Sequence, residues 1–312
     1  MMKFLNIEPS EYSKKAIEIY SSLGDYQELI AGDSPESFGD KSNVNCLIIR
    51  LAHRIDKSFL QPFSHLQYIL TPTTGLDHVD LEYCRERQIE VICLRGHHSF
   101  LKEITSTPEL TWALLLAAVR NLTSAHNSVL ELQWDRDRFR GYQLKGKTIG
   151  IIGLGRTGSQ VAEYAKAFGM NVIFYDPYVD HESLEKFKTL EALLAASDVV
   201  SIHVHLNEET QLLLNKENLK AIKTGSILVN TSRGKIVDEI ALVELLEKGV
   251  LRAVASDVLS EEFGDISVNP LYRAAKQGLN IILTPHLGGA TFDAMHICEE
   301  FIANQLKAKL SN

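Results

Sequence analysis

Short apolar runs alternate with helix-like stretches over the first hundred residues of the chain. Four runs predict strands, at Phe4–Ile7, Cys46–Leu51, Tyr68–Leu70 and Glu90–Leu94. Between them, Tyr12–Leu23 and Val79–Gln88 have the amphipathic spacing of helices. The strand runs are continuously apolar rather than alternating, which is typical of parallel strands covered on both faces. The pattern therefore predicts a small flavodoxin-like α/β domain.

A long apolar helix is expected next. The pattern Ser106-Thr-Pro-Glu109 is typical of a helix start, and it opens the apolar stretch Leu110–Val119. A polar segment from Asn121 to Lys147 follows, in which Trp134, Phe139 and Tyr142 are interleaved with charged residues. Two interpretations of this segment remain open, an exposed arm or a dimer contact.

From Thr148 onward, apolar runs and helical stretches alternate regularly. Strands are predicted at Thr148–Ile152, Asn171–Tyr175, Val199–Val204, Ser226–Asn230, Arg252–Ser256 and Asn280–Leu283. Asp238 suits the N-cap of a helix over Glu239–Lys248, and Gly249 suits its C′ position. This alternation predicts an α/β domain with a doubly wound parallel sheet of the Rossmann type.

Length, composition and charge narrow the class of protein. The chain has 312 residues, of which 45% are hydrophobic and 23% charged, as in ordinary globular proteins, and this length suits two domains. The net charge of −8 and the lack of basic runs argue against a nucleic-acid or anionic-membrane partner.

The cysteines and the apolar runs bear on the cellular compartment. Cys46, Cys84, Cys93 and Cys298 are scattered without metal-binding spacing, which favours reduced thiols over disulfides. The N-terminus has no apolar stretch like that of a signal peptide, and the longest apolar run, Trp112–Val119, is too short to span a bilayer. We therefore expect a cytoplasmic protein that does not associate with membranes.

A glycine-rich turn follows the strand that begins at Thr148. Gly153-Leu-Gly155-Arg-Thr-Gly158 lies between this strand and a predicted helix that runs to about Phe168. Gly153 would permit a tight turn, Gly155 would let the backbone approach a pyrophosphate, and Gly158 would allow close helix–strand packing. Free N–H groups at the helix start would then bind the phosphates, so a dinucleotide site is expected.

The acid at the end of the next strand indicates which dinucleotide is bound. Asp176 could accept hydrogen bonds from the ribose hydroxyls of the adenosine and would repel a 2′-phosphate. Pro177 and Tyr178 follow it, and no arginine lies nearby to bind that phosphate. The expected cofactor is NAD rather than NADP.

Further polar residues follow other predicted strands. Arg233 comes after Leu228–Ser232, Asp257 and Glu262 come after Ala253–Ser256, and His286 comes after Ile281–Pro285. In a doubly wound sheet, ligands bind at the carboxyl ends of the strands, where these side chains could converge. A fixed cation and a proton donor are what hydride transfer to a ketone requires, because negative charge develops on the oxygen.

Four ordered motifs together resemble the D-isomer-specific 2-hydroxyacid dehydrogenases. They are Gly153–Gly158 with Asp176, Asn230–Gly234, Asp257–Glu262 and Thr284–Thr291. Thr73–Asp80 also matches the substrate loop of that family. The resemblance implies a discontinuous architecture, with residues 1–104 and 288–312 as a substrate-binding lid domain and residues 105–287 as the dinucleotide-binding domain.

The resemblance also implies roles for individual residues. Arg233 would bind the substrate carboxylate and polarise the 2-keto oxygen, and His286 would exchange the proton at the C2 oxygen. Glu262 would hydrogen-bond the imidazole and keep it protonated. The backbone N–H groups of Thr74 and Gly75 would bind the substrate carboxylate from the lid domain. The implied cofactor contacts are Gly153, Gly155, Arg156, Thr157, Gly158, Asp176, His203, Thr231 and Asp257.

The sequence departs from the family pattern in two places. Phe263 follows Glu262 where proline is usual, and the stretch from Glu262 to His286 is longer than usual. His205 stands where proline is common. His203 and His205 would share one face of a strand, but no third ligand is evident, so we expect no metal site.

A cluster of basic side chains follows the last predicted strand of the lid domain. It contains Arg95, His97, His98 and Lys102. A solvated loop is one interpretation. The other is a surface that recognises the far end of an acidic or phosphorylated substrate.

Two functions from different classes are consistent with this sequence. The first is NAD-dependent interconversion of a 2-keto acid and a D-2-hydroxy acid, in an enzyme that resembles phosphoglycerate dehydrogenases and forms a homodimer. The alternative is a dinucleotide-sensing interaction protein that resembles the C-terminal-binding corepressors. Turnover of 2-keto acids distinguishes the two.

Overall fold

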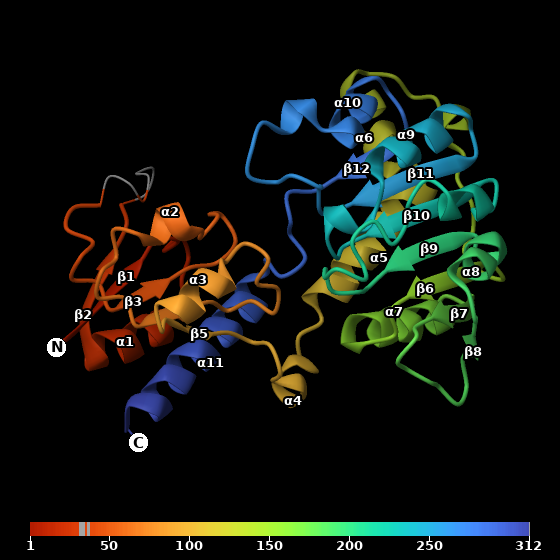
Figure 1. Cartoon of the computed structure of the whole chain (residues 1–312). Coiled ribbons are helices and arrows are strands. Elements are labelled where there is room, and N and C mark those ends of the chain that lie inside the picture. Colours follow the sequence, from red (N-terminus) through yellow and green to blue (C-terminus); the bar gives the residue numbers. More distant parts are fainter. Residues whose placement is uncertain (31–34, 36–37, 312) are drawn as a thin grey trace. The chain divides into compact units, whose positions relative to one another are not determined.

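The computed structural model describes residues 1–30, 35 and 38–311. Within it the chain divides into two compact units. Unit 1 consists of Met1–Ile104 and Ala290–Asn312, and unit 2 consists of Thr105–Gly289 (Figure 1). The two ends of the chain therefore contribute to the same unit.

Unit 1 is built on a five-stranded, fully parallel sheet. Its strands are β1 (Met2–Asn6), β2 (Gly24–Glu28), β3 (Cys46–Ile48), β4 (Tyr68–Leu70) and β5 (Glu90–Ile92), and its helices are α1 (Lys14–Leu23), α2 (Lys57–Leu60), α3 (Leu81–Glu86), α4 (His98–Leu101) and α11 (Phe292–Ser311). The spatial order β2-β1-β3-β4-β5 is the flavodoxin order, so the prediction of a flavodoxin-like sheet is confirmed.

The C-terminal helix packs into the core of unit 1. Tyr20 of α1 and Ile302 and Leu306 of α11 belong to one buried cluster with Phe4 and Ile48 of the sheet. A second cluster on the other face of the sheet includes Leu60 of α2 and Cys84 of α3. Both faces of the sheet are therefore covered, which explains why its central strands are continuously apolar.

Unit 2 contains a seven-stranded parallel sheet. Its strands are β6 (Thr148–Ile152), β7 (Asn171–Tyr175), β8 (Glu185–Lys186), β9 (Val199–Ile202), β10 (Ser226–Asn230), β11 (Leu251–Ser256) and β12 (Ile281–Leu283). The order β12-β11-β10-β9-β6-β7-β8 reverses direction between β6 and β9, as in a Rossmann fold. The predicted doubly wound sheet is confirmed.

Helices cover both faces of the unit 2 sheet (Figure 1). They are α5 (Ser106–Val119), α6 (Leu122–Leu130), α7 (Arg156–Ala167), α8 (Leu190–Ala196), α9 (Glu239–Glu247) and α10 (Pro270–Lys276), with short 3₁₀ turns η2 (Asp137–Phe139), η3 (Asn218–Ala221), η4 (Gly234–Ile236) and η5 (Ile266–Val268). Residues of α5 and α7 pack against one face, and residues of α8 and α9 pack against the other.

Local signals fix the ends of several helices. The Asp238 side chain accepts the N–H of Ala241 at the start of α9, and Gly249 after its end has φ 67°, as the predicted cap positions require. The helix α5 begins one residue earlier than the pattern Ser106–Glu109 predicts. Thr105 is the N-cap and Ser106 already lies in the first turn, where the Thr105 hydroxyl donates to Glu109.

Candidate active site

The glycine-rich turn Gly153–Gly158 joins β6 to α7, and at two of its glycines the neighbouring backbone leaves no room for a side chain. Gly153 has φ 88°, and a Cβ on it would lie 2.7 Å from the carbonyl oxygen of His203. A Cβ on Gly158 would lie 2.1 Å from the carbonyl oxygen of Gly153. Gly155 is different, because a Cβ there would meet no heavy atom of the described residues within 4 Å. Gly153 and Gly158 are therefore required for close packing of the backbone. Gly155 instead leaves open space before the first turn of α7.

Asp176 lies directly after β7 and is buried beside this turn. Its Oδ2 accepts the N–H of Leu154 at 2.9 Å. Its Oδ1 accepts the N–H groups of Tyr178 and Val179 at 2.9 and 3.1 Å. A carboxylate has about four acceptor positions, so these three bonds anchor the side chain and still leave room for a hydroxyl donor.

His203 follows β9 on the other side of the glycine turn. Its backbone N–H donates to Ile152 O at 2.7 Å, and its Nε2 lies 2.7 Å from the Ser201 hydroxyl. Burial lowers the pKa of His203 to about 3, so the ring is neutral at physiological pH. Nδ1 is buried and makes no hydrogen bond to any residue in the described part of the chain.

Arg233 and Thr231 lie at the carboxyl end of β10. The side-chain amide of Asn230 donates to Arg233 O at 3.0 Å, and Arg233 itself is half-buried. The hydroxyl of Thr231 lies 2.8 Å from that of Thr111 on α5, in a buried contact. The carboxyl end of β10 is therefore held by the side chain of Asn230, its last residue, and by the contact with Thr111 of α5.

Asp257 at the end of β11 is 1% exposed and holds the turn that contains His286. Its Oδ1 accepts from the Thr284 hydroxyl and from the Leu287 N–H, and its Oδ2 accepts the Gly288 N–H. Burial raises the pKa of Asp257, and these donors oppose that shift. The carboxylate that the sequence assigns to the cofactor thus also organises a loop.

Glu262 and His286 form a direct pair. Glu262 Oε2 lies 2.8 Å from His286 Nδ1, and Oε1 accepts the Leu259 N–H at 3.1 Å. Both side chains remain partly exposed, so the imidazole is accessible to a substrate. Since β10, β11 and β12 are neighbours, the segments that carry Arg233, Glu262 and His286 follow adjacent parallel strands.

Two family models match this chain, one over each unit. Residues 112–288 match the model of the NAD binding domain of the D-isomer specific 2-hydroxyacid dehydrogenases, and residues 12–99 match that of their catalytic domain. The chain belongs to the D-isomer specific 2-hydroxyacid dehydrogenase family. Unit 2 accordingly contains the NAD-binding domain, which confirms the prediction of NAD as the cofactor.

Several family members are similar over most of this chain. A D-3-phosphoglycerate dehydrogenase of Methanocaldococcus jannaschii is 35% identical over 316 residues, covering 99% of this chain but 58% of that protein. A glyoxylate reductase of Thermococcus litoralis is 35% identical over 277 residues, covering 85% of this chain and 80% of that protein. This chain thus spans little more than half the length of the phosphoglycerate dehydrogenase.

Solved structures of similar fold extend the likeness to three dimensions. The TT0316 protein of Thermus thermophilus has a TM-score of 0.85 at 34% identity, with 99% of this chain and 97% of that chain covered. A D-lactate dehydrogenase of Aquifex aeolicus, complexed with NAD and lactic acid, has a TM-score of 0.80 at 28% identity, with 99% and 95% covered.

The residues of this family member fit NAD. The open space at Gly155 admits a phosphate, and no side chain of the described residues caps α7, so the N–H groups of its first turn can bind that phosphate. Asp176 can accept a ribose hydroxyl. The buried Nδ1 of His203 can form a hydrogen bond that the described part of the protein itself does not provide.

The predicted substrate loop lies in unit 1, directly after β4. The Thr73 hydroxyl donates to Gly75 O at 2.9 Å, which shapes the turn at Thr74 and Gly75. Arg95 Nε donates to Thr74 O at 3.4 Å, so Arg95 lies beside this loop. His97 instead packs edge to face on Phe301 of α11, with ring centroids 4.8 Å apart, while His98 is exposed at the start of α4.

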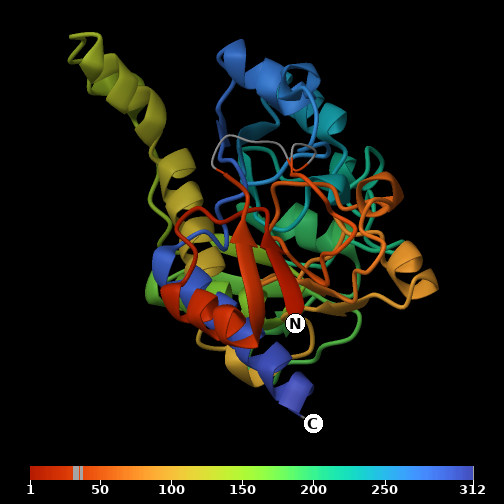
Figure 2. The same ribbon diagram turned by 90° about the vertical axis from the view of Figure 1, so that its left-hand side faces the viewer.

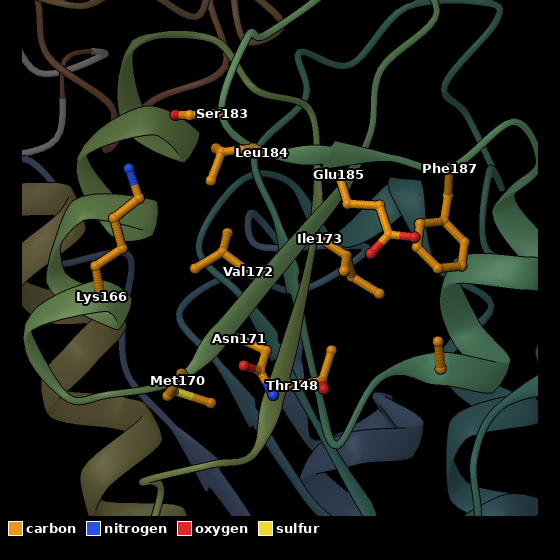
Figure 3. Close-up of a pocket in the computed structure, with 11 residues that line it drawn as sticks. Thr148, Lys166, Met170, Asn171, Val172, Ile173, Ser183, Leu184, Glu185 and Phe187 are labelled. Carbon is orange, nitrogen blue, oxygen red and sulfur yellow. The ribbon is translucent and has the colours of Figure 1, made fainter.

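No set of three or more His, Cys, Asp or Glu side chains is placed to hold a metal ion among the residues that the structure describes. None of the described helices is long and apolar enough to cross a membrane. A pocket lies along β7 and β8 at one side of the unit 2 sheet, and no predicted site residue is among those that line it (Figure 3).

Sequence reasoning missed several residues that shape the candidate site. Thr111 and Thr284 hydrogen-bond to predicted site residues, and Glu239 holds the loop that contains Glu262. Thr284 belongs to a motif that the sequence identified. Glu239 follows the predicted N-cap Asp238, so its only signal in the sequence is an acid in the first turn of a predicted helix, while its burial is known only from the structure.

Proposed function

We propose that this chain interconverts a 2-keto acid and a D-2-hydroxy acid, with NAD as the redox cofactor. The pairing of Glu262 with His286, on loops next to the one that contains Arg233, carries the proposal. The family relationship and the NAD-binding domain support it. When bound, NAD supplies or accepts the hydride that is exchanged with C2 of the substrate.

Arg233 would bind the substrate carboxylate and stabilise charge on the C2 oxygen. Its planar guanidinium can donate two parallel hydrogen bonds to a carboxylate, which lysine cannot do. A charged donor beside the C2 oxygen is most valuable during reduction, when negative charge develops there.

His286 would exchange the proton. Because Glu262 holds Nδ1, Nε2 is the nitrogen that can donate to the C2 oxygen in reduction and accept from the hydroxyl in oxidation. Glu262 fixes the ring orientation and balances the imidazolium charge. Such proton transfer typically contributes about 10²–10⁴-fold in rate.

We assign unit 1 the role of substrate-binding domain. Its loop at Thr74 and Gly75 follows the carboxyl end of a parallel strand, where α/β sheets bind ligands. The backbone N–H groups of this loop would bind the carboxylate. Arg95, in contact with Thr74 O, is the basic residue best placed to meet a second anionic group of the substrate.

Absorbance at the NADH band tests the proposal. Glyoxylate, pyruvate, hydroxypyruvate and 3-phosphohydroxypyruvate are each mixed with NADH and the whole chain. Consumption of NADH with at least one of them, and formation of the D-hydroxy acid, is expected. Tight binding of NADH with no turnover of any of them would favour the dinucleotide-sensing alternative.

A homodimer through the segment of residues 121–147 is part of the proposal. Leu132 and Trp134 are 96% and 88% exposed, and Leu122 and Leu130 are exposed on the same segment. In Figure 2 the olive helix α6 projects away from the unit 2 sheet. Exposed apolar patches of this kind mark protein contacts. Light scattering should show that the wild-type chain is a dimer and that the double variant Leu132→Asp, Trp134→Asp is a monomer. The control Val268→Asp, at another exposed apolar position, should remain a dimer.

The four cysteines, Cys46, Cys84, Cys93 and Cys298, are all free thiols. This supports the proposal of a reducing compartment, which we take to be the cytoplasm.

A further inference from the structure

The buried acid Glu239 contacts the loop that contains Glu262. It is the first residue of α9 and only 6% exposed. Oε1 accepts the Ser260 N–H at 2.7 Å, and Oε2 accepts the Ser260 hydroxyl at 2.6 Å and the Asn269 side-chain amide at 2.7 Å. A buried carboxylate is costly unless donors surround it, so these bonds hold Ser260 and Asn269 firmly.

The two partners of Glu239 lie on either side of Glu262 in the sequence. Ser260 is two residues before it, and Asn269 is seven residues after it. Asn269 also caps α10, since its Oδ1 accepts the N–H groups of Leu271 and Tyr272. One carboxylate thereby joins the first turn of α9, the N-terminus of α10 and the loop between β11 and α10.

A second contact fixes the same loop against the strand end at Arg233. A Cβ on Gly234 would lie 1.9 Å from the carbonyl carbon of Leu259 and 2.2 Å from Ser260 N. The loop backbone therefore lies directly on the residue after Arg233. Leu259 in turn donates its N–H to Glu262 Oε1, while Glu262 Oε2 contacts His286 Nδ1.

These contacts form a continuous path from Glu239 to the imidazole. Ser260 is held by Glu239, its neighbour Leu259 orients Glu262, and Glu262 orients His286. Glu239 is not required as the helix cap, because Asp238 already accepts the Ala241 N–H. Neither the proposed substrate contacts nor the cofactor contacts involve Glu239.

We propose that Glu239 is a positioning residue for the proton-transfer pair Glu262–His286. The inference rests on the proposed dehydrogenase function. Loss of the carboxylate would remove the bonds that hold Ser260 and that tie Asn269 to α9, and Glu262 would lose its fixed approach to the imidazole. A misplacement of about 1 Å in such a pair costs roughly 100-fold in rate.

The test uses the whole chain and the 2-keto acid from the panel that gives the fastest turnover. Glu239→Ala should lower kcat about 10-fold or more and change the Kd of NADH, measured by its fluorescence, less than about twofold. Glu239→Gln should lose less activity than Glu239→Ala, because its amide oxygen can still accept the Ser260 N–H.

A double-mutant cycle separates positioning from general damage. If Glu239 acts through Glu262, Glu239→Ala should cost less than about threefold in kcat once Glu262→Gln is present. The same loss in both backgrounds would overturn the inference, as would a kcat of Glu239→Ala within threefold of the wild type.

Asp198→Ala is the matched control for lost stability. Asp198 also accepts a backbone N–H, from Thr148, and a side-chain donor, from Lys223, but it lies at the opposite end of the strands. The variant Asp198→Ala should lower Tm and leave kcat unchanged. An equal loss of kcat in Asp198→Ala would overturn the inference. A wild-type chain that reduces no 2-keto acid would overturn the proposed function instead, which is a different result.

Discussion

The carboxylate of Asp257 accepts the backbone N–H of Gly288 at 2.8 Å, although 31 residues separate the two. It also accepts the Leu287 N–H, and the His286 N–H donates to Asp257 O. His286 has φ 55°, which is uncommon for a residue with a side chain and persists only where neighbouring contacts enforce it. Asp257 thus fixes the backbone that presents the imidazole.

Removal of the Arg233 guanidinium should abolish most of the activity with 2-keto acids. Arg233→Ala is expected to lower kcat/KM about 10²–10³-fold, because a charged donor is lost where negative charge develops. Arg233→Lys should recover only part of the loss, since it restores the charge without the planar fork. Steady-state kinetics at the NADH band measure both.

The control for this prediction is Arg273→Ala. Arg273 lies in the same unit, on α10, and is exposed, and its Nε donates to the carbonyl oxygen of Ser267 in η5, so kcat/KM should not change. If Arg233→Ala keeps kcat/KM within threefold of the wild type, Arg233 does not bind the substrate carboxylate.

Neutralising Asp176 should relax the preference for NADH over NADPH. In Asp176→Asn the charge that repels a 2′-phosphate is gone, so the ratio of kcat/KM for the two cofactors should fall roughly 10-fold or more. Tm should also fall, because an amide nitrogen cannot accept the N–H groups that Asp176 now holds. The control is Asp180→Asn, at an acid four residues away that pairs with Lys186, and it should leave the ratio unchanged. If Asp176→Asn also leaves the ratio unchanged, Asp176 does not determine the preference for NADH.

The sequence pattern predicted the buried strands more reliably than the edges of the sheets. Asn171–Tyr175 and Ser226–Asn230 have the predicted bounds, since the inner strands of a parallel sheet contain a run of apolar residues. The strands β2 and β8 were missed. Their sequences, Gly24–Glu28 and Glu185–Lys186, are polar and partly exposed, because an edge strand needs no apolar face on its open side.

The candidate site was predictable only where a residue type has a defined chemistry. The acid and the imidazole at Glu262 and His286 could be expected to pair, and they do. The contact of Gly234 with Leu259 and the bonds of Glu239 depend on how a long loop folds back on α9. Spacing in the sequence does not encode such contacts, so the residues that hold the site emerge only from the three-dimensional packing.

Two glycines of the turn Gly153–Gly158, Gly155 and Gly158, should respond differently to alanine. Gly155→Ala should fold normally, because its φ of −73° suits alanine and the new Cβ meets no atom of the described residues within 4 Å. It should raise the Kd of NADH about 10-fold or more, since the methyl group occupies the space where a phosphate approaches. Gly158→Ala should lower the free energy of unfolding by about 1–3 kcal/mol, because its Cβ would overlap Gly153 O.

Fluorescence titration with NADH and urea unfolding measure the two effects. Each variant serves as the control for the other, since the two glycines lie three residues apart in the same turn. Unchanged affinity in Gly155→Ala would show that phosphate does not approach this glycine.

The neutral ring of His203 should make unit 2 sensitive to acid. Burial lowers its pKa to about 3 in the folded chain, whereas an unfolded histidine titrates near 6.5. The unfolded state therefore binds a proton more readily. The stabilisation is fully present above pH 6.5 and is lost as the pH falls towards 3. Between pH 7 and pH 5 this one group should cost about 2 kcal/mol.

Urea unfolding without cofactor, followed by tryptophan fluorescence, tests this dependence, because Trp112 lies in the core of unit 2 and becomes exposed on unfolding. The free energy of unfolding of His203→Gln should fall about 2 kcal/mol less than that of the wild type over the same pH interval. His181→Gln, at an exposed histidine in the same unit, should follow the wild type. An equal pH dependence in His203→Gln and the wild type would mean that His203 is not buried in its neutral form.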